Sequence, residues 1–220
     1  MADYGAFDIV GPRMIGPSSS HTAGAAKLSY TAWKIAGKDV KKATLTLYGS
    51  FSDTGRGHGT DKALIAGILG LKPDDERLSS AYALSKQKGV DADVVFSDEE
   101  AEHPNTARIR IESKDGSVTE VVGVSVGGGN ILITNIDGFS VEFTAEYPTL
   151  IIRQRDVPGI ITKVTGILAD NGINIAFMRV FRQGRKEDAF MVIETDQAVP
   201  SDAVKKILSL GPDIVQVRAV

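Results

Sequence analysis

The 220-residue sequence contains no cysteine. A chain without cysteine has no disulfide framework, no zinc-thiolate site and no thiol nucleophile of its own. Long apolar runs are also missing, because stretches such as Ala63 to Leu71 are far shorter than the roughly 20 residues that span a bilayer. Met1 to Phe7 lacks a basic region followed by an apolar one, so we expect no export signal and a cytoplasmic protein.

The chain also has little excess of charge of either sign. The formal net charge is −3, charged residues make up 24% of the chain, and no dense block of lysine and arginine occurs. Proteins that bind nucleic acids or membrane surfaces usually carry such a block. We therefore expect small molecules or proteins as partners, and neither nucleic acid nor membrane.

The residue pattern resets near Glu146 to Pro148, which predicts two domains, residues 1–146 and 148–220. Apolar residues in the second domain alternate or recur at helical spacing between glycine and proline stops. The predicted elements are a strand at Thr149 to Arg153, a helix at Ile160 to Leu168, strands at Ile173 to Phe177 and Ala189 to Ile193 joined by a turn at Gly184-Arg185, a helix at Pro200 to Leu210 and a strand at Ile214 to Ala219. This βαββαβ order is ferredoxin-like.

The first domain is less regular, and its sheet topology does not follow from the pattern. The expected elements are helices at Thr22 to Ala36, Thr60 to Leu71 and Ser79 to Lys88, a strand at Ala43 to Gly49, and strands within Ala107 to Phe143 separated by turns at Asp115-Gly116, Gly127-Gly128-Gly129 and Asp137-Gly138. The whole chain is thus predicted to be an α+β protein that mixes helices and strands.

The segment Gly16 to Ala25 places three serines and His21 just before a helix of small residues. Free N–H groups at a helix start, together with serine hydroxyls, favour an anion such as a carboxylate or phosphate. A plain N-cap with surplus serines is the alternative. His21 favours the functional interpretation, since a histidine moves protons near neutral pH and a cap needs only one hydroxyl.

A second polar segment, Gly55 to Ala63, carries His58 among glycines and is predicted to be a loop between a strand and a helix. Loops at a sheet edge often bind ligands, and glycines let the backbone approach them closely, although a flexible connector is the alternative. Neither the Walker nor the dinucleotide-binding glycine spacing is present. A Ser20, His58 and Asp61 hydrolase triad is disfavoured because no G-x-S-x-G elbow occurs.

A third histidine, His103, stands in the turn Glu102 to Thr106, and a surface loop is the simplest interpretation of that turn. Three histidines without cysteine give no recognisable set of metal ligands. We therefore assign no metal ligand to this chain.

Four segments together resemble the signature loops of the iron-sulfur L-serine dehydratase β subunit: Ile15 to Ala25, Gly57 to Asp61, His103 to Thr106 and Gly127 to Gly129. The resemblance implies a first domain similar to the allosteric substrate-binding domain of certain phosphoglycerate dehydrogenases. It also implies a partner α subunit whose cysteines hold a [4Fe-4S] cluster. The implied lyase reaction converts L-serine to pyruvate and ammonia in serine catabolism, which feeds gluconeogenesis. The cluster iron would act as a Lewis acid on the hydroxyl while a base removes the Cα proton.

The same resemblance implies roles for individual residues. His21 and His58 are candidates for proton transfer or substrate orientation. Asp61 either orients His58 or caps its helix. Substrate binding, including a cradle for the carboxylate, is expected from Ser18, Ser19, Ser20, Thr22, Gly59 and Thr60.

In the second domain, the turn Asp156 to Gly159 and the segment Gly172 to Ile175 resemble the signature of an ACT domain. The resemblance implies an amino-acid effector site formed by Asp156, Pro158, Gly159 and Asn174, although Pro158-Gly159 can equally serve only to start the helix. We expect homodimerisation through this domain ahead of effector binding. The alternative to a catalytic subunit is a serine-sensing regulatory module without chemistry of its own.

Overall fold

A computed structural model describes residues 13–182, 184 and 187–220. Met1 to Phe7 and Arg185, on which two of the expectations above depend, lie outside the described residues. The chain divides by packing into two compact units, Met1–Asp137 and Gly138–Val220. The boundary predicted at residues 146–148 lies slightly later along the chain.

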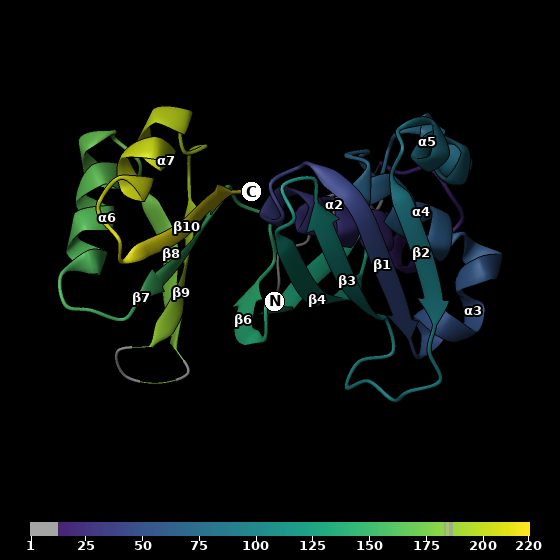
Figure 1. The fold of residues 1–220 in the computed structure, drawn as a ribbon. Coiled ribbons are helices and arrows are strands. Elements are labelled where there is room, and N and C mark those ends of the chain that lie inside the picture. Colours follow the sequence, from purple (N-terminus) through teal and green to yellow (C-terminus); the bar gives the residue numbers. More distant parts are fainter. Residues whose placement is uncertain (1–12, 183, 185–186) are drawn as a thin grey trace. The chain divides into compact units, whose positions relative to one another are not determined.

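The first unit combines helices with a mostly antiparallel arrangement of strands (Figure 1). Its strands lie in the order β2-β1-β3-β4-β5, and only β1 and β2 pair in parallel. Its elements are η1 (Ser19–Gly24), α2 (Ala25–Ile35), β1 (Val40–Tyr48), α3 (Ser50–His58), α4 (Thr60–Ile68), η2 (Glu76–Ser80), α5 (Ala81–Gln87), β2 (Asp91–Phe96), β3 (Thr106–Ser113), β4 (Val118–Gly127) and β5 (Asn130–Ile136).

One face of these strands forms the core of the first unit. Leu45 of β1 lies opposite Ile109 of β3 and Val94 of β2, and both Leu45 and Ile109 are fully buried. Helices α2 and α4 pack together against this face, with α2 touching β3, β4 and β5 and α4 touching β1. The alternation of apolar side chains in β1 therefore directs every second residue into one helix-covered core.

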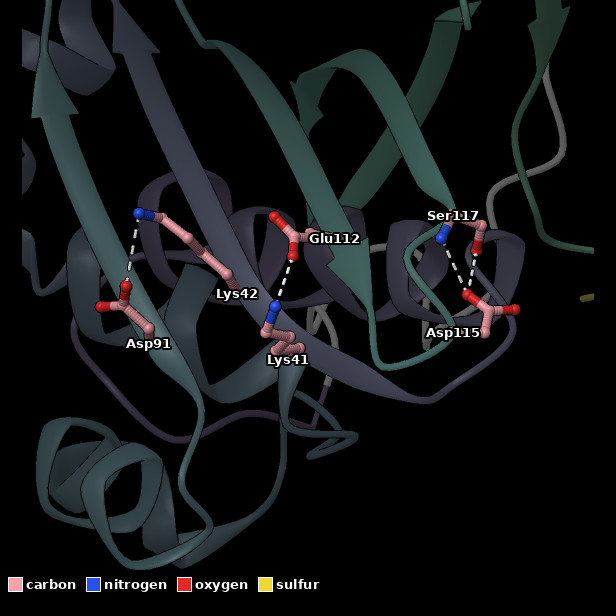
Figure 2. A network of polar contacts seen from close by, with 6 residues as sticks. All are labelled: Lys41, Lys42, Asp91, Glu112, Asp115 and Ser117. Carbon is pink, nitrogen blue, oxygen red and sulfur yellow. Dashed lines mark hydrogen bonds and ion pairs between the residues drawn. The ribbon is translucent and has the colours of Figure 1, made fainter.

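Exposed charged side chains of β1 pair with side chains of the neighbouring strands β2 and β3 (Figure 2). Lys41 lies 2.8 Å from Glu112 of β3, and Lys42 lies 3.4 Å from Asp91 of β2. In the turn between β3 and β4, the Asp115 carboxylate accepts hydrogen bonds from the backbone N–H and the hydroxyl of Ser117. Exposed pairs of this kind contribute little to stability, so the sheet does not depend on them.

The predicted glycine-rich loop is largely wrong, because Gly55 to His58 belong to α3. A side chain at Gly55 would lie 3.3 Å from both Leu47 and Thr60, so the glycine permits close packing of the helix on β1. The capping role considered for Asp61 is also wrong. Gly59, with φ of 69°, is the N-cap of α4, and no side chain caps that helix.

The second unit contains β6 (Phe139–Phe143) and a complete ferredoxin-like arrangement, as predicted. Its four-stranded antiparallel sheet has the order β10-β7-β9-β8. The elements that follow β6 are β7 (Thr149–Arg155), α6 (Ile160–Asp170), β8 (Ile175–Arg182), β9 (Asp188–Thr195), α7 (Ser201–Leu208) and β10 (Ile214–Ala219). The α+β class is thereby confirmed.

Two layers of contacts stabilise the second unit. Apolar residues of α6 and α7, including Val164 and Ile207, are buried in one cluster with Ile152 of β7 and Ile193 of β9. Strand β6 packs against β8 and β9, where the rings of Phe139 and Phe190 lie 4.8 Å apart. Within the part of the chain that the structure describes, no helix is long and apolar enough to cross a membrane.

Candidate functional site

The serine-rich segment folds as η1, a π-helical turn that runs directly into α2. The Ser18 hydroxyl accepts a hydrogen bond from the His21 backbone N–H at 3.0 Å. The Ser18 carbonyl accepts from the N–H groups of both Thr22 and Ala23, at 3.0 and 3.1 Å. Ser18 is therefore an N-cap, as the alternative interpretation stated, while the π turn is a feature often found at functional sites.

The start of α2 sits tightly against β4 because Gly24 has no side chain. A Cβ atom at Gly24 would overlap the Ser125 hydroxyl and lie 2.8 Å from Ser125 Cβ. The neighbouring triple-glycine turn lies near Ser20, whose hydroxyl is 3.9 Å from the position of a Cβ at Gly127. Two of the segments named by the resemblance thus meet at this end of the first unit.

His21 and His58 come together from separate segments. Their ring centroids lie 4.9 Å apart with the planes inclined by 40°. His21 Nε2 faces the hydroxyl and the carbonyl of Ser50, at 3.1 and 3.3 Å. His58 Nδ1 faces the Thr54 carbonyl at 3.1 Å. The structure therefore forms a histidine pair, in which each ring has a defined partner.

The environment of His21 favours its neutral form. Burial lowers the pKa of the His21 ring, the nearby His58 lowers it further, and the Ser50 backbone acts in the opposite direction. Burial disfavours the charged imidazolium because a low-dielectric surrounding solvates it poorly. A neutral imidazole beside a second histidine is suited to accept a proton near neutral pH.

A pocket of about 250 Å³ opens beside the histidine pair. It is lined by Ile15, Gly16, Pro17, Thr22, Arg56, Gly57, His58, Gly59, Lys62, Ala63, Leu78 and Ser79. Arg56 and Lys62 bring positive charge to the rim, and the Arg56 guanidinium is stacked over the Phe96 ring at 4.5 Å. Arg56 and Lys62 stand on either side of His58 in the sequence. Their closeness to a predicted site residue is the signal that could have identified them as lining residues.

Asp61 and Thr60, two further predicted residues of the first unit, lie at the start of α4. The Tyr82 hydroxyl donates a hydrogen bond to Asp61 Oδ2 at 2.9 Å, and the buried Asp61 Oδ1 has no hydrogen-bond partner among the described residues. Burial and this bond raise the pKa of Tyr82 to about 12. Thr60 is fully buried, and no residue that the structure describes forms a hydrogen bond with its hydroxyl. Asp61 is thus engaged with Tyr82, a residue that sequence reasoning missed.

The His103 to Thr106 turn packs into the same end of the unit. Within the turn, His103 Nδ1 accepts a hydrogen bond from the Asn105 backbone N–H at 3.1 Å, and the Thr106 hydroxyl donates to the His103 carbonyl at 2.6 Å. The Asn105 carbonyl accepts from the Ser125 N–H at 3.0 Å. The turn is therefore tied to β4, next to the start of α2.

The four predicted effector residues of the second unit have different roles in its structure. Gly159 caps α6 with a φ of 88°, and the preceding Pro158 is exposed. The Asp156 carboxylate pairs with Arg182 at 3.1 Å. Asn174 donates to the Asp196 carboxylate at 2.7 Å and lines a shallow groove of about 470 Å³ along α6.

The residues 13–182, 184 and 187–220 contain no group of three histidine, aspartate or glutamate side chains that can hold a metal. The chain has no cysteine either. The cysteine thiolates that usually hold an iron-sulfur cluster are therefore absent from this sequence.

Comparison with known proteins connects this architecture to characterised families. Residues 7–135 match the family "Serine dehydratase beta chain", and residues 148–212 match the ACT domain. The chain is 40% identical to the "Probable L-serine dehydratase, beta chain" of Bacillus subtilis, with 97% of this chain and 96% of that protein covered. It is 36% identical to the "L-serine dehydratase, beta chain" of Peptoniphilus asaccharolyticus, over 96% and 95%.

A more distant similarity links the chain to another enzyme class. The D-3-phosphoglycerate dehydrogenase of Bacillus subtilis is 30% identical over 72% of this chain, although the match covers only 30% of that enzyme. The fold and the matches define a two-domain protein that joins a histidine-bearing site to an ACT domain. The chain belongs to the serine dehydratase β-chain family, as the resemblance predicted.

Proposed function

We propose that this chain is the β subunit of an L-serine ammonia-lyase, which converts L-serine to pyruvate and ammonia together with an α subunit. The observation that carries the proposal is the pairing of His21 and His58, with ring centroids 4.9 Å apart, beside a pocket that both polar segments line. Two histidines exceed what a binding site for an amino acid needs, since hydroxyls and backbone N–H groups can hold a carboxylate alone.

The reaction breaks the Cα–H and Cβ–O bonds of serine and releases water. The resulting aminoacrylate tautomerises to an imine, which water hydrolyses to pyruvate and ammonia. A base must accept the Cα proton, and a neutral histidine near the substrate can do so. His21 and His58 are the proposed groups for proton transfer or substrate orientation, and Asp61 supports this segment through Tyr82.

The substrate carboxylate is the anion that the π turn is proposed to bind. The hydroxyls of Ser19 and Ser20 form no hydrogen bond to another described residue, so they are available to a ligand. Ser18 and Thr22 shape the cradle through their own bonds to the backbone. Gly59 lines the pocket and Thr60 lies directly behind it, while Arg56 and Lys62 add complementary charge.

The iron-sulfur cluster is assigned to the α subunit. This chain supplies no thiolate, and no step of the mechanism proposed for its residues passes through the cluster. The division of labour is that the partner holds the cluster, while this chain binds serine and moves its proton.

The second domain, residues 148–220, is proposed to regulate the enzyme by homodimerisation and by binding an amino-acid effector near Asp156, Pro158, Gly159 and Asn174. The ACT match over residues 148–212 supports a regulatory role. Isothermal titration of the full chain with single amino acids, repeated with Asn174→Ala, tests the effector site. Sedimentation of the full chain tests the homodimer.

The deciding experiment measures anaerobic pyruvate formation from L-serine by this chain alone, by the α subunit alone, and by both reconstituted with iron and sulfide. Activity only in the mixture supports a catalytic subunit. If the α subunit is fully active alone and this chain only changes its dependence on serine, the chain is a serine-sensing module. In the active mixture, near-normal turnover of His21→Ala with loss of activity in His58→Ala would exclude His21 as the base.

A further inference from the structure

Ser50 is the first residue of α3 and lies against the edge of the His21 ring. Its hydroxyl oxygen is 3.1 Å from His21 Nε2, and its carbonyl oxygen is 3.3 Å from the same nitrogen. Ser50 lies 29 residues from His21 in sequence, outside every segment that the sequence pattern singled out. The contact therefore depends entirely on the fold.

The two Ser50 oxygens restrict which nitrogen of His21 carries the proton. A carbonyl oxygen can only accept a hydrogen bond, whereas a hydroxyl can accept or donate one. Both contacts are satisfied together only if Nε2–H is the donor. In a neutral imidazole, protonation of Nε2 leaves the lone pair on Nδ1.

The position of Ser50 is fixed from the opposite side. Gly49 has a φ of 52°, and a Cβ there would lie 2.8 Å from the Pro104 carbonyl oxygen. The same oxygen accepts a hydrogen bond from the Phe51 N–H at 3.2 Å. Phe51 is fully buried, and its ring meets the His21 ring edge-on at 5.2 Å. The segment Gly49 to Phe51 thus holds His21 by a polar contact and by an apolar one.

His58 has the complementary arrangement. Its Nδ1 lies 3.1 Å from the Thr54 carbonyl, which can only accept a hydrogen bond. This contact requires Nδ1–H and leaves the lone pair of His58 on Nε2. The two paired rings therefore present different nitrogens as proton acceptors.

We propose that Ser50 is a positioning residue that holds His21 in the Nε2–H tautomer, so that Nδ1 is the nitrogen of His21 that accepts a proton. The proposal rests on the proposed lyase function where it concerns catalysis. Its structural part, the tautomer, concerns this chain alone. The Ser50 carbonyl belongs to the backbone and also accepts a bond from the Thr54 hydroxyl at 2.9 Å. The Ser50 hydroxyl is therefore the partner of His21 that a substitution can remove.

The tautomer is measured by ¹H–¹⁵N NMR of the full chain labelled at histidine. The three histidines are assigned with His21→Gln, His58→Gln and His103→Gln. We expect a protonated Nε2 and an unprotonated Nδ1 at His21 in the wild type. Ser50→Ala should carry a larger fraction of Nδ1–H, because only the carbonyl, at 3.3 Å and shared with the Thr54 hydroxyl, then still favours Nε2–H. Ser50→Thr restores the hydroxyl and should restore the single tautomer. Ser52→Ala, on the same helix, is the matched control and should match the wild type.

The kinetic test uses the reconstituted complex with the same variants. For Ser50→Ala we expect kcat to fall by about tenfold with little change in KM, which is less than the loss of roughly 100-fold or more on removing a general base. Ser50→Thr and Ser52→Ala should remain near the wild type. A purely structural role of Ser50 would lower stability without moving the tautomer.

Several results would overturn the proposal. A wild-type His21 that carries its proton on Nδ1 contradicts it, even if Ser50→Ala does not fold. An unchanged tautomer together with an unchanged kcat in Ser50→Ala also contradicts it. If the complex shows no lyase activity, the proposed function fails, but the NMR measurement still decides the tautomer.

Discussion

The Thr22 hydroxyl donates a hydrogen bond to the His58 carbonyl at 2.9 Å. Thr22 lies in η1 and is buried, while His58 is the last residue of α3. Carbonyl groups at the C-terminal end of a helix have no partner within the helix. This bond therefore satisfies an otherwise unpaired carbonyl and fixes the separation of the two histidine-bearing segments.

Replacing Thr22 by valine keeps the shape of the side chain but removes the donor. We expect the free energy of unfolding to fall by about 1 kcal/mol, because a partly buried carbonyl loses its partner. The kcat of the reconstituted complex should fall as well, since the histidine pair loosens. Urea denaturation and pyruvate formation measure the two effects, and Thr22→Ser should restore both. Equal stability of Thr22→Val and the wild type would argue against the bond.

Alanine at Gly24 tests the close contact between α2 and β4. The new methyl group would overlap the Ser125 hydroxyl, so we expect a loss of about 1–3 kcal/mol in the free energy of unfolding. Gly57→Ala is the matched control, because Gly57 is also helical and no described residue outside its own stretch of helix lies within 4 Å of its Cβ position. That variant should gain about 0.4–1 kcal/mol in urea denaturation. A Gly24→Ala protein as stable as Gly57→Ala would contradict the described packing.

The lowered pKa of His21 predicts a specific dependence of stability on pH. The unfolded chain binds a proton at the ordinary value of 6.5, whereas burial keeps the folded ring neutral to lower pH. The stability contributed by the neutral ring is therefore complete above pH 6.5 and is lost as the pH falls through the folded pKa. His21→Gln should show a shallower loss of stability below pH 6.5 in urea denaturation. His103→Gln, which alters a histidine outside the pair, is measured alongside so that the effect of His21 is compared with the loss of another histidine.

The bond between Tyr82 and Asp61 can be measured through the tyrosine. Asp61→Asn removes the negative charge, so the pKa of Tyr82 should fall from about 12 but stay above the ordinary value of 10, because burial remains. The ultraviolet absorbance of tyrosinate follows this titration. Tyr82→Phe identifies the signal among the five tyrosines. An identical titration in Asp61→Asn would show that the bond is not formed in solution.

The second domain could be predicted from sequence because its signals are local. Alternating apolar residues, Gly172 after α6 and Pro200 before α7 each act within one turn or strand. The turns at Asp115-Gly116 and Gly127 to Gly129 were found for the same reason. The strand order of the second domain then follows from the few arrangements that a βαββαβ chain can adopt.

The sequence did not reveal α3 or β2, and each has a physical reason. Helix α3 contains Gly55 and Gly57, which disfavour an isolated helix, and it is stabilised by the fully buried Phe51. Strand β2 pairs in parallel with β1, and the partner in such a pair lies far away in sequence. Both elements depend on tertiary contacts that no local pattern records.

In the candidate site, too, local features could be predicted from the sequence and tertiary contacts could not. Both histidines were recognised from their segments, but their contact with one another was not, because it needs α3 to bring His58 back to η1. Ser50 and Arg56 were missed because they lie in α3, which was not predicted. Tyr82 lies in a predicted helix and was missed because its bond to Asp61 joins two separate helices. Residue identity thus located the polar segments, and tertiary structure supplied their partners.

The π turn at the start of α2 means that the length of this segment is as important as its side chains. A single-residue deletion that turned η1 into ordinary α-helix would rotate the residues before it by about 100° relative to α2. His21 would then leave the ring of His58 and the edge of Ser50 without any change in its own identity. The number of residues between Ser18 and Gly24 therefore determines where His21 lies in the site.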